Sequence, residues 1–279
     1  MVPGRILFLV AGASAFHAHA GARLTAKPSI CPQASLAIPV VSASVLTHGA
    51  AAISGGSGLF AWVAPKANAD GYGVIGDDGI GDSAYYQVRQ VGAWQLVNAF
   101  VLLSGLKGAR IASATLLGAA AWSTIACIPA NEYFERPKGP AILSAAAFAV
   151  LGKLTHKGRI STYVGGGIIA LLGALIHFTP KETAAMYKVD PIKASPLYLS
   201  MLAATGSTVL TSGFYVLALS AGLTQLRALG YTMLLSSAFA VKFIATEAEA
   251  LGVKTAALIG PLAWRTAVQL ALAVLALCA

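Results

Sequence analysis

The sequence predicts an all-α protein, a polytopic transmembrane helical bundle of about six or seven spans, and three observations support this prediction. First, 57% of the 279 residues are hydrophobic and only 10% are charged, whereas soluble domains carry about 25% charged residues. Second, apolar segments are separated by short loops of Pro, Gly and charged residues, which end helices and stay in water. Third, no apolar segment alternates with period two, which argues against a transmembrane β-barrel.

Seven apolar segments between Val88 and the C-terminus are the predicted spans. They cover residues 88–106, 111–128, 141–151, 163–178, 197–223, 226–245 and 256–277. A membrane-spanning helix needs about 20 apolar residues. The third segment is therefore too short to cross the membrane unless its flanks join it or the bilayer thins locally.

The first 35 residues form two targeting segments. Residues 1–15 combine Arg5, a short apolar core and the small-residue site Ala13-Ser14-Ala15, which together predict a secretory signal peptide. Residues 16–35 contain basic and hydroxylated residues but no acidic residue, which is typical of a transit peptide.

The junction between these segments, Ala13-Ser14-Ala15-Phe16, is an "ASAF" sequence with Phe at the start of the transit part. It resembles the bipartite leader of nuclear-encoded plastid proteins in algae whose secondary plastid came from a red-alga endosymbiont. The resemblance covers only residues 1–35. It implies a plastid membrane protein of such an alga.

Two interpretations are open for residues 36–69, which are mildly apolar and end at the small-residue site Ala67-Asn68-Ala69. They form either a thylakoid-transfer segment that is removed before Asp70, or a weak membrane helix that the mature protein keeps. Residues 70–85 are rich in Asp and Gly and lack basic residues, and we expect a lumenal tail there. Residues 86–279 are the predicted transmembrane helical domain.

Charge in the loops predicts the orientation of this domain. The first, third and fifth loops after the tail hold the basic residues Lys107, Arg110, Lys153, Lys157, Arg159 and Arg227, whereas opposite charges nearly cancel in the other loops. The positive side of a membrane protein faces the cytoplasm, or the stroma in a plastid. The sequence therefore predicts a multi-pass protein of the thylakoid membrane with its N-terminal tail in the lumen.

Two blocks of the chain, residues 92–151 and 206–277, predict a parallel three-helix repeat. Each block contains three helices, an acidic loop and a Gly-Pro pair, Gly139-Pro140 in the first and Gly260-Pro261 in the second. Four spans separate equivalent helices, so the two repeats would have the same orientation in the membrane. The alternative is that any two Ala- and Leu-rich hairpins look alike.

The chain shows no catalytic motif and no cysteine framework, so we expect neither an enzyme nor a structural metal site. Polar groups inside membrane spans mark functional sites by default. A chlorophyll magnesium accepts one axial ligand from a His, Asn, Gln or Glu side chain. The candidate ligands are His177, Gln95, Asn98, Gln269, and Glu132 or its neighbour Glu135. The structural alternatives are packing amides, a histidine at a helix end and loop acids.

The leader, the scarcity of charge within the spans and the many small residues along them favour an accessory subunit of a thylakoid complex, photosystem I with its antenna. Such a subunit would bind chlorophyll and carotenoid and contact photosystem core subunits, light-harvesting antenna proteins and membrane lipids, but not nucleic acid. The chain lacks the ExxHxR or ExxNxR signature of ordinary antenna proteins. The alternative is a small plastid transporter or channel of two parallel repeats, indicated by Arg265 within the last span.

Overall fold

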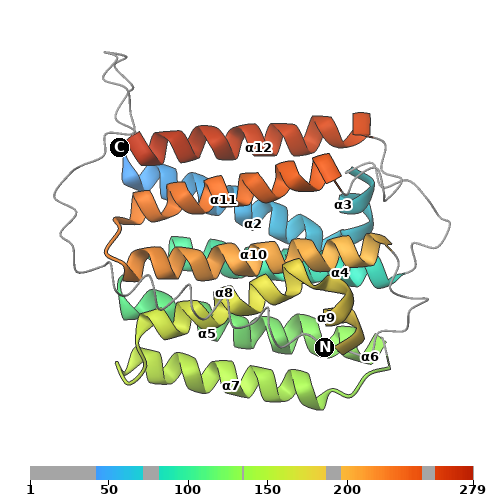
Figure 1. Ribbon diagram of the computed structural model, residues 1–279, viewed down its shortest axis with the longest axis horizontal. Helices are drawn as coiled ribbons and strands as arrows, with labels where there is room; N and C mark the ends of the chain where they lie inside the picture. The colour runs from blue at the N-terminus through green and yellow to red at the C-terminus, as the bar shows by residue number, and fades with distance from the viewer. Residues whose placement is uncertain (1–41, 72–81, 134, 187–195, 247–254, 279) are drawn as a thin grey trace. The chain divides into compact units, whose positions relative to one another are not determined.

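The computed structural model describes residues 42–71, 82–133, 135–186, 196–246 and 255–278, and all regular structure in this part is helical. This confirms the prediction of an all-α protein rich in apolar helices. The predicted signal peptide, the transit peptide and most of the Asp-rich tail lie outside the described residues. The long helices run side by side (Figure 1), and residues 39–277 form one compact unit.

The helices correspond closely to the predicted segments. Their bounds are α2 Ala43–Val63, α3 Pro65–Gly71, α4 Asp82–Leu103, α5 Ala109–Trp122, α6 Ile128–Tyr133, α7 Gly139–His156, α8 Thr162–Phe178, α9 Pro180–Met186, α10 Pro196–Ser220, α11 Gln225–Thr246 and α12 Thr255–Cys278. The predicted helical segment at residues 141–151 is shorter than the helix in the structure. Helix α7 continues through Lys153 and His156 in its last turn, where cations interact favourably with the helix dipole.

Helices α5 and α6 form one continuous span because a π-helical segment, η1, joins them at Ser123–Cys127. The segment precedes Pro129, which has no backbone N–H and whose ring clashes with the carbonyl of residue i−4 in a regular helix. The wider π turn, in which the Ile128 N–H bonds the Ser123 carbonyl, absorbs this break. Proline therefore shapes the span without ending it.

Three described helical segments are long and apolar enough to cross a membrane: Ala109–Tyr133, Tyr198–Ser220 and Gln225–Thr246. A fourth is reached if α8 and α9, which meet at 102° across Thr179, count as one broken span. These segments support a multi-pass membrane protein. The larger count of six or seven spans is not confirmed by length and composition.

Glycine allows two helix pairs, α2 with α4 and α8 with α10, to pack with their backbones in contact. A Cβ on Gly58 would lie 2.8 Å from the Gly92 carbonyl oxygen, and one on Gly173 would lie 2.8 Å from the Gly206 carbonyl oxygen. Neither position has room for a larger residue. Close approach through small residues is the main source of helix association in a membrane, where burial of apolar surface contributes little.

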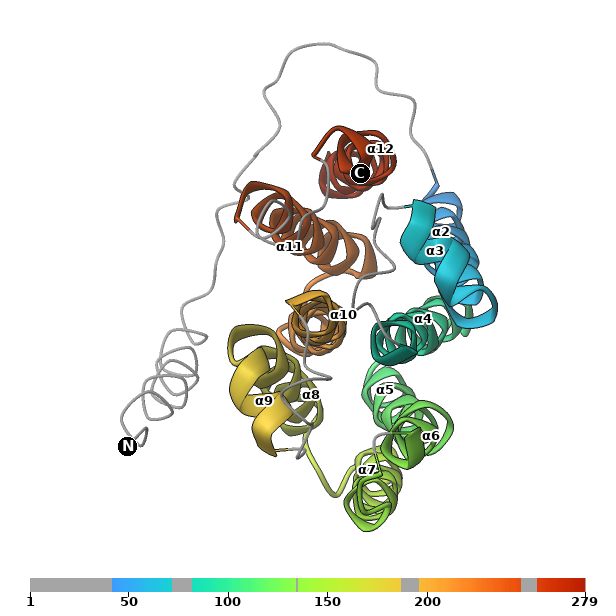
Figure 2. The ribbon, with the colours of Figure 1, turned by 90° about the vertical axis from the view of Figure 1, so that its right-hand side faces the viewer.

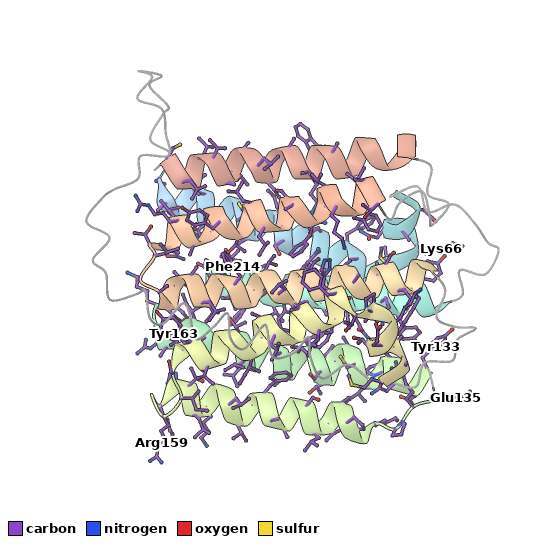
Figure 3. The ribbon with its side chains drawn as sticks, viewed as in Figure 1. Lys66, Tyr133, Glu135, Arg159, Tyr163 and Phe214 are labelled. Atoms are coloured by element: carbon purple, nitrogen blue, oxygen red, sulfur yellow. The ribbon has the colours of Figure 1, made fainter. Side chains whose placement is uncertain are left out.

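Helices α4 and α10 lie next to each other in the middle of the unit. In Figure 2, α5 and α7 lie on one side of this pair, and α11 and α12 lie on the other. Buried apolar residues fill the space among α4, α5, α8 and α10, with Trp94 fully enclosed and in edge-to-face contact with Trp122 at 5.3 Å. Charged side chains lie at several helix ends. Figure 3 shows Arg159 at one end of the helices and Lys66 and Glu135 at the other.

We predict that Gly206→Ala destabilises the protein, whereas Gly167→Ala does not. The new methyl group would collide with the His177 backbone nitrogen and the Gly173 carbonyl oxygen, but a Cβ on Gly167 meets open space. Overpacking of this kind costs about 1–3 kcal/mol. Thermal unfolding of the two variants in detergent measures the difference, and equal unfolding temperatures would contradict the backbone contact.

Candidate functional site

A polar cavity of about 110 Å³ lies among α2, α4, α10, α11 and α12, with one contribution from α5. Several of its residues lie near the middle of their helices, far from the helix ends: Ser54 in α2, Ser236 in α11 and Arg265 in α12. The polar residues around the cavity are Ser54, Gln95, Asn98, Thr115, Thr208, Thr211, Ser212, Tyr215, Thr232, Ser236, Arg265 and Gln269. Such a concentration of polar groups is unusual inside an apolar bundle.

Hydrogen bonds between helices hold one wall of the cavity. The Ser212 hydroxyl of α10 shares its proton between Asn98 Oδ1 of α4 at 2.6 Å and the Thr208 carbonyl of its own helix at 2.7 Å, and it accepts from the Trp94 indole N–H at 2.8 Å. Gln95 Oε1 accepts from the Ser57 hydroxyl of α2 at 3.0 Å. These bonds fix the side-chain oxygens of Asn98 and Gln95 against neighbouring helices.

Threonine hydroxyls elsewhere in the wall bond to their own helices. Thr208 Oγ1 donates to the Thr205 carbonyl at 2.8 Å, and Thr232 Oγ1 donates to the Ala228 carbonyl at 2.7 Å. A hydroxyl has a single proton, so each of these groups presents lone pairs to the cavity. The side chains of Ser236 and Gln269 make no hydrogen bond within the described part of the chain, so their donors remain available.

Three of the five candidate ligands predicted from the sequence, Gln95, Asn98 and Gln269, line this single cavity. The sequence also singled out Arg265, but it gave no reason to place Arg265 beside the two α4 amides. The serines and threonines of α10 and α11 were missed, because a hydroxyl in an apolar helix usually bonds its own backbone. Their positions near the middle of long apolar helices were the available signal.

The other two candidate ligands lie elsewhere. His177, at the end of α8, is buried; its Nδ1 lies 2.9 Å from the Ala203 carbonyl oxygen and so carries the proton, and its ring contacts Phe178 and Phe239. Glu132 is exposed and forms an ion pair of 3.2 Å with Lys138. The structure therefore does not bring all five residues into one site.

A second hollow is almost wholly apolar. It is a groove of about 710 Å³ along the outer side of α4 and α5, with Trp62 and Trp122 among its lining residues. Gly118 is among its lining residues, and the absence of a side chain there makes room for Val97 of α4. Arg110, at the start of α5, and His156, at the end of α7, place basic groups at one end. A long apolar molecule with a polar end would match this shape.

Comparison with known proteins finds no matching family model, no matching curated protein and no matching solved structure.

We predict that Ser212→Ala lowers the stability of the protein by about 1 kcal/mol, the usual contribution of one interhelical hydrogen bond. The variant leaves the Trp94 indole N–H and Asn98 without their shared partner. Ser144→Ala, on an exposed face of α7, is the matched control and should change stability little. Denaturation in detergent, followed by tryptophan fluorescence, measures both, and a neutral Ser212→Ala would show that the bond contributes nothing.

Proposed function

We propose that this chain is a small plastid membrane transporter built from two parallel repeats, with its solute bound in the cavity that Arg265 lines. The observation that carries the proposal is an arginine at the middle of an apolar helix, beside a polar cavity. Placing arginine at the centre of a membrane helix costs about 2.5–3.5 kcal/mol on insertion scales, and such residues generally mark pathways for ions or substrates.

Equivalent contacts in the two halves support a repeat. In the first half, a Cβ on Gly92 would meet the backbone of Gly58 and the backbone nitrogen of Trp62. In the second half, a Cβ on Gly206 would meet the backbone of Gly173 and the backbone nitrogen of His177. The offset in residue number is nearly the same for all three pairs: Gly92 with Gly206, Gly58 with Gly173, and Trp62 with His177.

The same offset in residue number pairs further residues of the two halves. It matches Asn98 with Ser212, and these two side chains hydrogen-bond each other between α4 and α10. It also matches Gly105 with Gly222, which follow the ends of α4 and α10 with φ values of 60° and 86°. Two equivalent residues touch each other only where they lie on a symmetry axis. We therefore place a pseudo-two-fold axis between α4 and α10.

This arrangement extends the predicted three-helix repeat to four helices. The first repeat is α2, α4, α5 and α7, and the second is α8, α10, α11 and α12. Contacts between the halves agree with the symmetry, because α5 packs on α8 as α11 packs on α2. An even number of helices gives both repeats the same orientation, with the axis along the membrane normal.

Transporters made of structural repeats bind substrate near the middle of the bilayer, where the repeats meet, and expose the site to each side by rocking. The proposed repeats would place the cavity where they meet, near the middle of the helices. It adjoins the α4–α10 contact and takes residues from both repeats.

If α2 belongs to the first repeat, the mature protein must keep it. We predict that the N-terminus of the purified protein lies before Ala43, because α2 packs along α4 and Ser54 lines the cavity. N-terminal sequencing after purification from an alga with a red-lineage plastid tests this. A mature protein that begins at Asp70 would lack α2 and would contradict both the four-helix repeat and the proposed site.

An accessory subunit of photosystem I is the second candidate, and the apolar groove along α4 and α5 favours it. The groove has an apolar lining that suits a chlorophyll or carotenoid tail, and His156 offers an imidazole at one end. In this role the protein would migrate with a photosystem on a native gel after mild solubilisation, and it would carry pigment. Migration as a free, colourless protein would favour the transporter.

We predict that vesicles containing the protein take up small polar solutes faster than protein-free vesicles, and that Gln269→Phe abolishes the difference. Phenylalanine at this position would fill the cavity and block the path. Light-scattering measurements of vesicle swelling in acetate, nitrate, urea and glycerol provide the readout. Phe100→Leu, at an exposed position in the apolar groove, is the control and should transport normally. Equal rates with and without protein for all four solutes would refute transport.

A further inference from the structure

We infer that the cavity binds one small planar oxyanion, a carboxylate, nitrate or bicarbonate, and that Arg265 of the second repeat provides the anion's main contact. The inference names the solute of the proposed transporter and in that sense rests on it. Binding itself requires only the cavity and its lining.

The positive charge of Arg265 indicates that the ligand is an anion. Arg265 is the one charged residue in the lining, and no acidic side chain of the described residues joins it there. Arg265 also contacts other residues of the protein. A guanidinium has five N–H donors, however, so an internal partner and an anion can share it. Its planar fork matches the two oxygens of a planar oxyanion.

The donors that remain point to the same ligand. Thr208 and Thr232 give their protons to backbone carbonyls, and Asn98 Oδ1 is held by Ser212. Donors without a partner among the described residues are the side-chain N–H groups of Gln269, Gln95 and Asn98 and the hydroxyls of Ser236 and Tyr215. Gln269 lies on α12 with Arg265, and the others come from α4, α10 and α11. No acidic side chain of the described residues lines the cavity, so a cation would find no negative partner among them.

The volume limits the size of the ligand. A water molecule takes about 30 Å³ in the liquid, so a cavity of about 110 Å³ holds a few waters or one anion of about four heavy atoms. Acetate, nitrate and bicarbonate meet this limit. Sugars, nucleotides and tricarboxylates do not.

The first repeat provides an internal comparison for the site. The correspondence between the halves matches Thr208 with Trp94 and Gln269 with Phe148. Trp94 is fully buried, and Phe148 packs against the same apolar cluster. Aromatic rings occupy these positions in the first repeat, whereas the smaller polar residues at the equivalent positions of the second repeat line the cavity. Polar residues of the second repeat therefore stand at positions where the first repeat packs aromatic side chains.

Ligand-induced thermal stabilisation of the full-length protein in detergent tests the inference. Acetate and nitrate should raise the unfolding temperature in a saturable way. Acetamide has nearly the shape of acetate but no charge, and gluconate has the charge but exceeds the volume, so neither should stabilise the protein. Acetamide stabilising as strongly as acetate would overturn the inference while leaving a transporter of neutral solutes intact.

Four variants localise the effect. Arg265→Gln should weaken acetate binding at least tenfold, Arg265→Lys should lose less, and Arg227→Gln, at the exposed start of α11, should bind normally. Thr208→Trp copies Trp94 of the other repeat and should fold while losing acetate binding, so it tests the site even if Arg265→Gln does not fold. Unchanged acetate binding in Arg265→Gln or Thr208→Trp would refute the site. Acetate binding without vesicle uptake would instead support the site and refute transport.

Discussion

Backbone contact between helices at glycine is the constraint on which the rest of the structure depends. In a bilayer, helices gain little from hiding apolar surface, so close packing must hold them together. Gly58 against Gly92 and Gly173 against Gly206 allow two helix pairs to approach until backbone meets backbone. These contacts set the positions of α4 and α10, and the hydrogen bond from Ser212 to Asn98 depends on those positions.

The two halves use one scaffold for different purposes in our proposal. Trp94 and Trp122 of the first half pack edge to face, whereas Thr208 and Gln269 of the second half line a cavity with hydroxyl, amide and guanidinium groups. Apolar packing stabilises a core, whereas a polar cavity forgoes that stabilisation. A protein retains such a cavity when the cavity serves a function.

The apolar groove and the polar cavity suit different molecules. The groove faces outward along α4 and α5 and has basic groups at one end, so a lipid or pigment could lie there. The cavity is small and is lined by polar residues of several helices, which suits the compact polar ligand of our proposal. A carrier of anions could contain both, with the groove holding a lipid against its outer surface.

The sequence by itself determined the helical class and placed most helices within a few residues, because apolar runs and the Pro, Gly and charged residues between them act locally. It also identified Gln95, Asn98, Gln269 and Arg265 as polar residues in apolar segments. Only the tertiary structure decided that these four line one cavity, because α4 and α12 are far apart in the chain and the packing of the whole bundle brings their residues together. It also decided the extent of α7 and the packing of α2 on α4, which depend on neighbours that local sequence patterns do not reveal.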